Sequence, residues 1–340
     1  MKQRKYYDEL TVMSGIAIIF VLAIHGCGSA LKSFYPGDAT YAAADLWLRT
    51  ISNFVAPAVP MFLFVSGFKY AANDAQTPYL AFLKKRLPRV LMSFAIINTL
   101  FWVLDSIMYM ESFDLILLAK TYIHSWVGYS VAYQLWYIPM YCCVMMACPL
   151  VRRIIPSTVV RFGIFALIGI LQRVLEVEIP MLETYPIRFI SYPVFFEMGV
   201  LAQEKQWRDK ISAVSGVLVG GIYCAAVLVF SWILPELSAN GLSKYILFYF
   251  LGTVAMFAVS LSFKSSRVLQ WLGAVSYPVF LLREPLIGRY TGLQLSRIAL
   301  HNSILHMLLW IAITFTFTLF LIKVLQKIKC DRFLWHFSLS

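Results

Sequence analysis

Long apolar runs separated by short polar segments repeat along nearly the whole chain of 340 residues. A helix needs about 20 mostly apolar residues to cross a bilayer, and ten of these runs approach that length. The pattern therefore predicts ten membrane spans, at Thr11–Leu31, Ile51–Tyr70, Val90–Met110, Leu135–Val151, Val159–Leu175, Arg188–Ala202, Val214–Leu234, Tyr245–Phe263, Val268–Ile287 and Ile304–Ile322.

Proline and polar residues modify this pattern at three places. Pro57 and Pro60 lie inside the second predicted span and predict a kink or a broken helix there. The segments 32–49 and 111–134 are polar and aromatic, and we expect both outside the membrane, the first with a short helix near its end.

Composition supports the membrane interpretation. Of all residues 60% are hydrophobic and only 14% are charged, whereas about 25% of a soluble domain is charged. No linker, low-complexity stretch or soluble domain interrupts the apolar pattern. We expect an all-α, polytopic membrane protein with one transmembrane domain over residues 1–340.

The charge of the chain fixes its expected orientation. The net charge is +12, and most Lys and Arg residues fall in the segments that ten spans would put on the same side as both termini. Cytoplasmic loops carry such an excess, so we expect both termini in the cytoplasm, contact with membrane lipids and no nucleic-acid partner. The six cysteines lack metal-ligand spacing, and we expect neither a disulfide framework nor a metal site.

His25 is the polar exception in the first span. At 1.5 Å per residue it lies about 21 Å along the span from Thr11, in the outer half of the bilayer. A histidine at such a position usually faces a protein interior or a wet cavity. It could merely bond to a neighbouring helix, or its imidazole could act in acyl transfer as a base or nucleophile.

A basic cluster precedes the third span, with Lys84, Lys85, Arg86 and Arg89 within six residues. Orientation of the chain and binding of anionic lipid headgroups would explain such a cluster. The sharper hypothesis is a clamp for a phosphorylated donor, because Arg86 and Arg89 would project from one face of a helix.

Ser66, Gly67 and Trp136 are weaker candidates for a substrate or structural role. Glycine at position 67 permits close backbone approach, which could serve either a ligand or helix packing. Trp136 begins an aromatic stripe with Tyr137 and Tyr141, which is typical of an interfacial belt and could also form a substrate platform.

Charged residues in or near the spans are further candidates. Glu197 lies in the sixth span towards the cytoplasm, Asp105 in the third towards the outside, and Arg283 and Glu284 are adjacent in the ninth. Charges in membranes usually pair internally, and for each of them structural pairing is as good an explanation as catalysis.

Five blocks of the sequence together resemble the acyltransferase-3 family of bacterial membrane O-acyltransferases. They occur in the family's order and cover nearly the whole chain: SGIAIIFVLAIH, which ends at His25, VPMFLFVSGFKYA at Val59–Ala71, FLKKRLPRVL at Phe82–Leu91, QLWYIPMY, and LGAVSYPVFLLREPLI at Leu272–Ile287.

This resemblance implies a function and a place for it. The family has ten core helices in the bacterial cytoplasmic membrane and transfers an acyl group, usually acetyl from acetyl-CoA, to a hydroxyl of a cell-surface or lipid-linked carbohydrate. By the same resemblance His25 takes the catalytic role, and Arg86 and Arg89, with neighbouring Lys85, take the donor-binding role.

The sequence departs from the family pattern at two sites. The family's first helix usually carries an arginine eleven residues before the histidine, with an acidic residue three residues earlier; these positions are Ser14 and Thr11 here. The late block usually contains a histidine where this chain has Arg283. A non-enzymatic exporter or translocation component on the same scaffold therefore remains an alternative to the enzyme.

Overall fold

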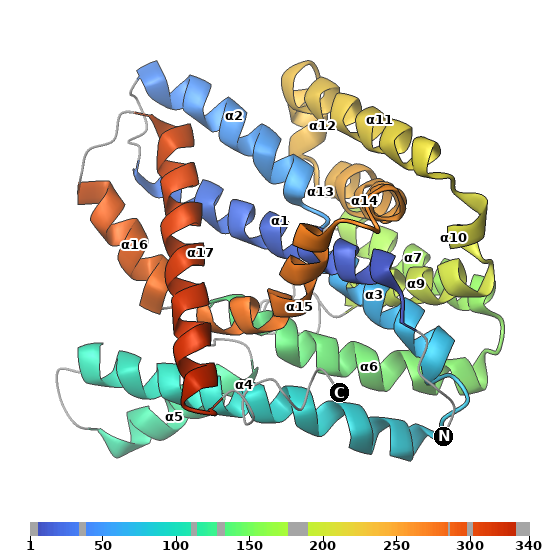
Figure 1. The fold of residues 1–340 in the computed structure, drawn as a ribbon, viewed down its shortest axis with the longest axis horizontal. Helices are drawn as coiled ribbons and strands as arrows, with labels where there is room; N and C mark the ends of the chain where they lie inside the picture. Colours follow the sequence, from blue (N-terminus) through green and yellow to red (C-terminus); the bar gives the residue numbers. More distant parts are fainter. Residues whose placement is uncertain are drawn as a thin grey trace.

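The computed structural model describes residues 6–33, 39–109, 114–127, 133–175, 190–284, 286–297 and 302–330, and within these ranges every regular element is a helix (Figure 1). The first half of the chain contains α1 (Asp8–Ser33), α2 (Ala39–Val55), α3 (Ala58–Asn73), α4 (Tyr79–Tyr109), α5 (Leu115–Val127), the 3₁₀ turn η1 (Tyr133–Trp136), α6 (Tyr137–Ile154) and α7 (Thr158–Val174).

The second half continues the helical pattern with several short elements between the long ones. Its elements are α9 (Pro193–Glu204), α10 (Trp207–Lys210), α11 (Ala213–Trp232), α12 (Pro235–Ala239), α13 (Gly241–Ser243), the π-helix η3 (Lys244–Leu251), α14 (Gly252–Ser262), α15 (Arg267–Leu282), α16 (Leu286–Arg297) and α17 (Ser303–Lys327).

The prediction of a polytopic, all-α membrane protein is confirmed. Within the described residues, seven helical stretches are long and apolar enough to cross a membrane: Asp8–Ser33, Asp45–Asn73, Tyr79–Ile107, Gln134–Ile154, Val214–Trp232, Gly241–Ser262 and Ser303–Lys327. The other three predicted spans overlap the shorter helices α7, α9 and α15, and the ninth also runs past the end of α15 into α16.

The sixth predicted span differs most from its helix. The span was expected at Arg188–Ala202, but α9 begins only at Pro193 and has 12 residues; residues 188 and 189 lie outside the described ranges. At 1.5 Å per residue α9 is about 18 Å long, too short for a hydrocarbon core of about 30 Å.

Two further expectations concern breaks and loops. The predicted break in the second span is confirmed, because α2 ends at Val55 and α3 begins at Ala58, on either side of Pro57. Much of the segment expected to be an outer loop at 111–134 is instead α5, which bonds to α4 through Asn98 and Ser125, 2.8 Å apart.

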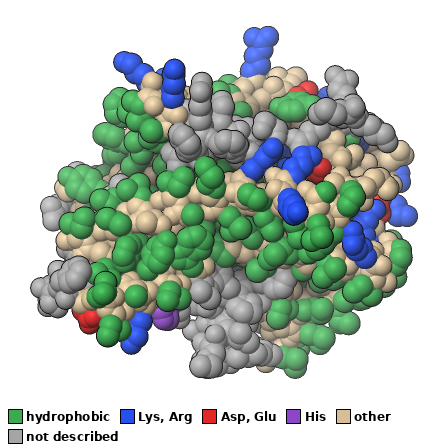
Figure 2. All heavy atoms as spheres, turned by 90° about the horizontal axis from the view of Figure 1, so that it is seen from below, with side chains coloured by type: hydrophobic (Ala, Val, Ile, Leu, Met, Phe, Trp, Pro, Cys, Tyr) green, Lys and Arg blue, Asp and Glu red, His purple; other side chains and the backbone are tan. Residues whose placement is uncertain are grey.

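Apolar side chains cover the outside of the bundle, as a lipid environment requires. Figure 2 shows a broad band of hydrophobic side chains across the face that lies below the view of Figure 1. On α4 the exposed apolar residues recur along one face, namely Leu91, Met92, Ile96, Leu100, Val103 and Ile107.

Helix α1 lies in the middle of the bundle and contacts α2, α3, α14, α15 and α17 (Figure 1). Two glycines allow α1 and α15 to cross closely: a Cβ at Gly15 would lie 2.2 Å from the carbonyl oxygen of Leu269, and one at Gly273 would lie 2.0 Å from that of Thr11. This crossing helps to hold the carboxyl end of α15 in register with the outer half of α1.

Helices α3 and α9 cross in the same way. A Cβ at Gly67 would lie 1.9 Å from the carbonyl oxygen of Phe196, and a Cβ at Gly199 would lie 2.0 Å from that of Phe64. Side chains at either position would force the helices apart. Gly67 therefore serves helix packing, the plainer of its two predicted roles.

Candidate active site

A cavity of about 1490 Å³ reaches the outer half of α1. Five lining residues of α1 follow helical spacing, so they form one stripe facing the cavity; these are Val21, His25, Gly28, Ser29 and Lys32. His25 therefore faces a hollow interior, as the sequence suggested for a histidine at that depth.

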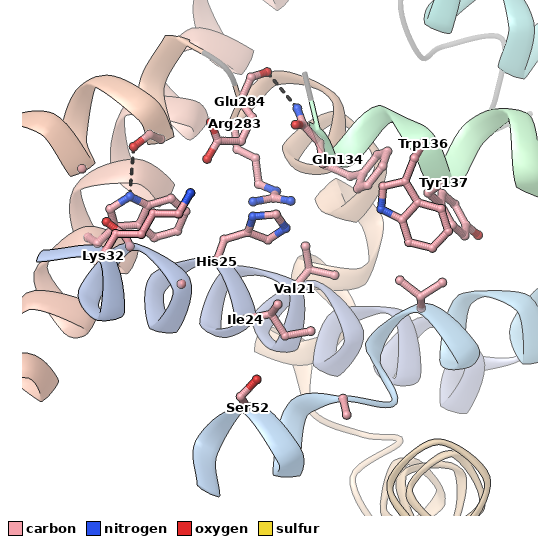
Figure 3. A pocket seen from close by; sticks show the side chains of 18 of the residues that line it. Val21, Ile24, His25, Lys32, Ser52, Gln134, Trp136, Tyr137, Arg283 and Glu284 are labelled. Carbon is pink, nitrogen blue, oxygen red and sulfur yellow. Dashed lines mark hydrogen bonds between the residues drawn. The ribbon is translucent and has the colours of Figure 1, made fainter. Parts of the chain in front are cut away.

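Arg283 lies beside His25 in this cavity. Figure 3 shows its guanidinium group directly next to the imidazole ring, although the two residues come from helices far apart in sequence. The Arg283 side chain is completely buried. Its backbone N–H donates to the carbonyl oxygen of Val279 at 3.2 Å, and its carbonyl oxygen accepts from the backbone N–H of Gly288 at 2.8 Å.

Arg283 and Glu284 occupy the break between α15 and α16, inside the stretch predicted as the ninth span. In the sequence Glu284 precedes a proline, and a residue before proline disfavours the α conformation. Two side chains bind this break from other elements: Gln134 Nε2 donates to the carbonyl oxygen of Glu284, and Trp310 Nε1 donates to that of Gly288, each at 2.9 Å.

Trp136 lines the cavity at the junction of η1 and α6 (Figure 3). Its ring contacts that of Tyr192 with centroids 5.7 Å apart, and that of Tyr137 in an edge-to-face arrangement. These two tyrosines line the cavity as well. Trp136 and Tyr137 of the aromatic stripe are therefore part of the cavity wall, the position that a substrate platform requires, whereas Tyr141 lines a different pocket.

A second, narrower pocket of about 200 Å³ lies on the predicted cytoplasmic side. Ser66, Arg86, Arg89 and Tyr141 are among its lining residues. Because α4 begins at Tyr79, the basic segment is helical, and Arg86 and Arg89 project into the same pocket.

Asp74 binds two members of the basic cluster. Its carboxylate lies 2.5 Å from Arg86 Nη2 and 3.3 Å from Lys85 Nζ. Burial acts to raise the pKa of this carboxyl, but the hydrogen bond and charge of Arg86, together with the charge of Lys85, outweigh burial and lower the pKa below its ordinary value. Lys85 does not line either of the two pockets among the described residues.

The two pockets meet in the middle of the bundle. Both are lined by Val21, Val59, Tyr137 and Phe280. Since Val21 lies one helical turn before His25, the shared wall is about 6 Å along α1 from the histidine. A ligand in the narrow pocket and a ligand in the large cavity would therefore come together close to His25.

Glu197 belongs to a different part of the molecule. It is buried and bonds to Arg161, 3.0 Å away, and neither residue lines the two pockets. This pair is the internal pairing that the sequence left open for Glu197. Asp105 likewise pairs with Arg289 at 3.5 Å.

The residue at the family's arginine position, Ser14, is buried within α1 and donates to the carbonyl oxygen of Leu10 at 2.9 Å. It lies about 16 Å along the helix from His25. Arg283 stands next to His25 instead, and so it adds a positive charge at a different level of the bundle.

A comparison with protein-family models matches residues 7–326 to the acyltransferase domain of the acyltransferase-3 family. The chain belongs to this family. The prediction made from the five sequence blocks is thereby confirmed, and the protein is a membrane acyltransferase in the general sense. No curated protein and no solved structure matches the chain.

Sequence reasoning missed several residues around the sites of this acyltransferase. Gln134 stands at the start of the QLWYIPMY block, but its partner, Glu284, is remote in sequence. Asp74 is the acid nearest to the basic cluster in the sequence, which could have identified it as a counter-charge. Lys32 follows His25 by two helical turns, a spacing that predicts the same face.

Among the described residues, no group of three or more His, Cys, Asp or Glu side chains is placed to hold a metal ion.

Proposed function

We propose that this protein is an O-acyltransferase of the bacterial cytoplasmic membrane. It moves an acyl group, acetyl in the simplest case, from acyl-CoA to a hydroxyl of a cell-surface or lipid-linked carbohydrate. Family membership supports acyl transfer in general, while the donor, the acceptor and the roles of individual residues rest on the arrangement of the two pockets.

The observation that carries the proposal is the shared wall of these pockets. The positive-inside pattern assigns the narrow pocket to the cytoplasm and the large cavity to the outside. Four residues line both spaces, so a donor entering from one side and an acceptor entering from the other would meet there. His25 stands on the acceptor side of this meeting point.

The narrow pocket suits the slender part of a CoA thioester. Its volume of about 200 Å³ is below the range of about 300–1,000 Å³ typical of pockets that enclose a whole ligand. An extended arm would fit inside while the nucleotide stays near the membrane surface. Arg86 and Arg89 would bind its phosphates, a task suited to the planar, permanently charged guanidinium group.

The proposed step uses His25 as a general base. The imidazole accepts the proton of the acceptor hydroxyl while the hydroxyl oxygen attacks the thioester carbonyl carbon. A C–O bond forms, the C–S bond breaks, and the proton on His25 passes to the departing thiolate. The products are an ester and a free thiol, so atoms and charge balance without a metal or a redox partner.

One observation favours the non-enzymatic alternative. The family's first-helix arginine is replaced by Ser14, whose hydroxyl bonds only within its own helix among the bonds described. A lineage that lost catalysis could carry this change and still export a glycan. Under this alternative, glycan export depends on the protein and glycan acetylation does not.

Replacement of His25 tests the proposal against this alternative. We expect His25→Ala to lower acetylation of envelope glycans at least 100-fold, because loss of a general base typically costs about 10²- to 10⁴-fold. Protein level and polymer export should stay unchanged. His124→Ala, which removes an exposed histidine on α5, is the matched control. Full acetylation in His25→Ala would refute the catalytic assignment, and loss of export alone would support the alternative.

A binding measurement tests the donor assignment separately. We expect Arg86→Gln combined with Arg89→Gln to weaken acetyl-CoA binding at least tenfold. Lys264→Gln combined with Arg267→Gln removes the same charge from another position on the predicted cytoplasmic side and should leave binding within about twofold. Equal weakening in both double variants would mean that general charge, and no specific clamp, attracts the donor.

A further inference from the structure

Arg283 is a buried cation whose guanidinium group has no hydrogen-bond partner in the part of the chain that the structure describes. Its side chain is completely buried, and its Nε, Nη1 and Nη2 atoms have no hydrogen-bond partner among the described residues. A guanidinium group carries five N–H donors, and a buried charge without a partner is costly. Figure 3 shows this group facing the cavity beside His25. An anion entering the cavity would supply the missing partner.

The acid next to Arg283 in sequence does not fill this role. The Glu284 carboxylate accepts a hydrogen bond from the backbone N–H of Arg289 and lies against Gly288. It therefore binds the first turn of α16. Glu284 lowers the net charge of the cavity without making a hydrogen bond to Arg283.

The backbone around Arg283 is held in place without the guanidinium group. Its N–H and C=O groups bond to Val279 and Gly288, and Gln134 fixes the next carbonyl. Because these bonds fix the backbone from which the Arg283 side chain projects, that part of the site is in place before a ligand arrives. Preorganisation reduces the entropy that binding costs.

The whole cavity is biased towards anions. Its described lining includes Lys32, Arg173, Arg283 and Arg289 against the acid Glu284, and of these cations Arg289 also pairs with Asp105, which does not line the cavity. A cavity lined mainly by one sign of charge concentrates ligands of the opposite sign. Lys32 lies on the same face of α1 as His25, about 10 Å nearer the outer end.

We propose that Arg283 binds an anionic group of the acceptor, so that the acceptor is an acidic carbohydrate bearing a carboxylate or a phosphate. This inference rests on the proposed function, because it names the substrate class of the same site. Arg283 lines the outer cavity and not the narrow pocket, which assigns its ligand to the acceptor side. Bidentate pairing with a planar carboxylate or a phosphate is the use to which guanidinium geometry is best suited.

A sugar series tests the proposal without any acyl transfer. The full chain would be placed in phosphatidylcholine nanodiscs, so that anionic lipids do not compete, and its melting temperature followed by tryptophan fluorescence at constant ionic strength. The ligands are glucose, glucuronate and glucose 6-phosphate. We expect at least one acidic sugar to give a saturable rise and glucose to give none; the stronger acidic sugar distinguishes a carboxylate from a phosphate site.

Variants of Arg283 make the test specific. Arg283→Gln should weaken binding of the acidic sugar at least tenfold, and Arg283→Lys should keep part of it. Arg267→Gln removes the same charge from the opposite, exposed end of α15 and should leave binding within twofold. Equal responses to glucose and glucuronate, no response to any of the three sugars, or equal losses in Arg283→Gln and Arg267→Gln would each overturn the proposal.

The same assay separates this proposal from the proposed function. His25→Ala should bind the acidic sugar normally while losing acetylation. If His25→Ala keeps full acetylation, the catalytic assignment of His25 is wrong. If the same variant still binds the acidic sugar, the anion site at Arg283 is unaffected by that result. If Arg283→Gln lowers the rate constant of acylation but leaves acidic-sugar binding intact, the guanidinium serves the reacting carbonyl, and the acceptor assignment is wrong.

Discussion

Arg161 and Arg283 are both completely buried in this acyltransferase, but their surroundings are opposite. Arg161 donates from Nε to Glu197 at 3.0 Å, from Nη1 to the carbonyl oxygens of Ile155 and Pro156 at 2.8 Å, and from Nη2 to Thr158 Oγ1 at 2.8 Å. The guanidinium group of Arg283 has no such partner among the described residues.

The difference separates a structural charge from a binding charge. Arg161 joins α7 to α9 and to the turn before α7, so its hydrogen bonds are part of the folded bundle. Arg283 faces a cavity and lies beside His25. A buried charge is tolerated when its partners are built in or when a ligand completes them, and the two arginines illustrate these two cases.

The largest effect should follow from breaking the Arg161 pair. Glu197→Ala leaves the Arg161 charge buried without its counter-ion, and such losses cost about 3–5 kcal/mol. The free energy of unfolding, measured by detergent titration, should fall by that amount. Glu204→Ala is the control on the same helix, because its pair with Arg152 is 3.3 Å long and partly exposed; it should cost less than about 1 kcal/mol. Equal effects would mean that burial does not decide the strength of these pairs.

Arg283→Gln should change the free energy of unfolding in the opposite direction. Removing a buried, unpartnered charge relieves a cost of about 1–3 kcal/mol, reduced to the extent that water in the cavity solvates the charge. We therefore expect a free energy of unfolding between unchanged and about 3 kcal/mol higher in the absence of ligand. The same substitution at the fully bonded arginine, Arg161→Gln, should strongly lower the free energy of unfolding. A comparable loss in Arg283→Gln would show that the two arginines share a structural role.

Asp74 tests a case of intermediate burial. Its carboxyl is buried, but Arg86 and Lys85 are 27% and 40% exposed, so Asp74→Asn should cost about 1–2 kcal/mol at neutral pH. The pKa of Asp74 in the folded protein lies below its ordinary value. Its contribution is therefore full above the unfolded-state pKa of about 3.9 and disappears as the pH falls through the folded-state pKa.

Thermal unfolding measured over a range of pH checks the direction of this pH dependence. The melting temperature of the wild type should exceed that of Asp74→Asn at pH 7, and the two should converge below about pH 4. A gap that widens as the pH falls would mean that the carboxyl is held protonated in the fold and that the Arg86 contact does not stabilise it as an ion pair.

The positions of the helices could be predicted from the sequence because hydropathy depends on local composition. Each of the ten predicted spans overlaps a helix among the described residues, and the break at Pro57 was visible as a proline within an apolar run. The shortness of α9 was not visible, because apolar residues on both sides of Pro193 continue the pattern across the start of the helix. Helix α5 was missed because its apolar run of 13 residues is too short to resemble a span and lies within a longer segment that was interpreted as polar and aromatic.

The site could be predicted only in part. Helical rise placed His25 in the outer half, and helical spacing brought Arg86 and Arg89 together. The neighbours of these residues come from distant elements: Arg283 reaches His25 across 258 positions of the numbering, and Glu197 reaches Arg161 across 36. Such pairs depend on how helices cross, which the glycines at positions 15 and 273 determine through contacts that no local pattern reveals.

The smallest effect should come from Asp105, which extends the comparison to an exposed pair. It lies 3.5 Å from Arg289, and the two side chains are 38% and 50% exposed. Exposed pairs contribute about 0.2–1 kcal/mol and are screened by salt, so Asp105→Asn should lower the free energy of unfolding by less than about 1 kcal/mol, and the difference should shrink as salt is raised. A larger loss that salt does not reduce would mean that this pair acts as a buried one, and burial alone would no longer distinguish the arginines of this protein.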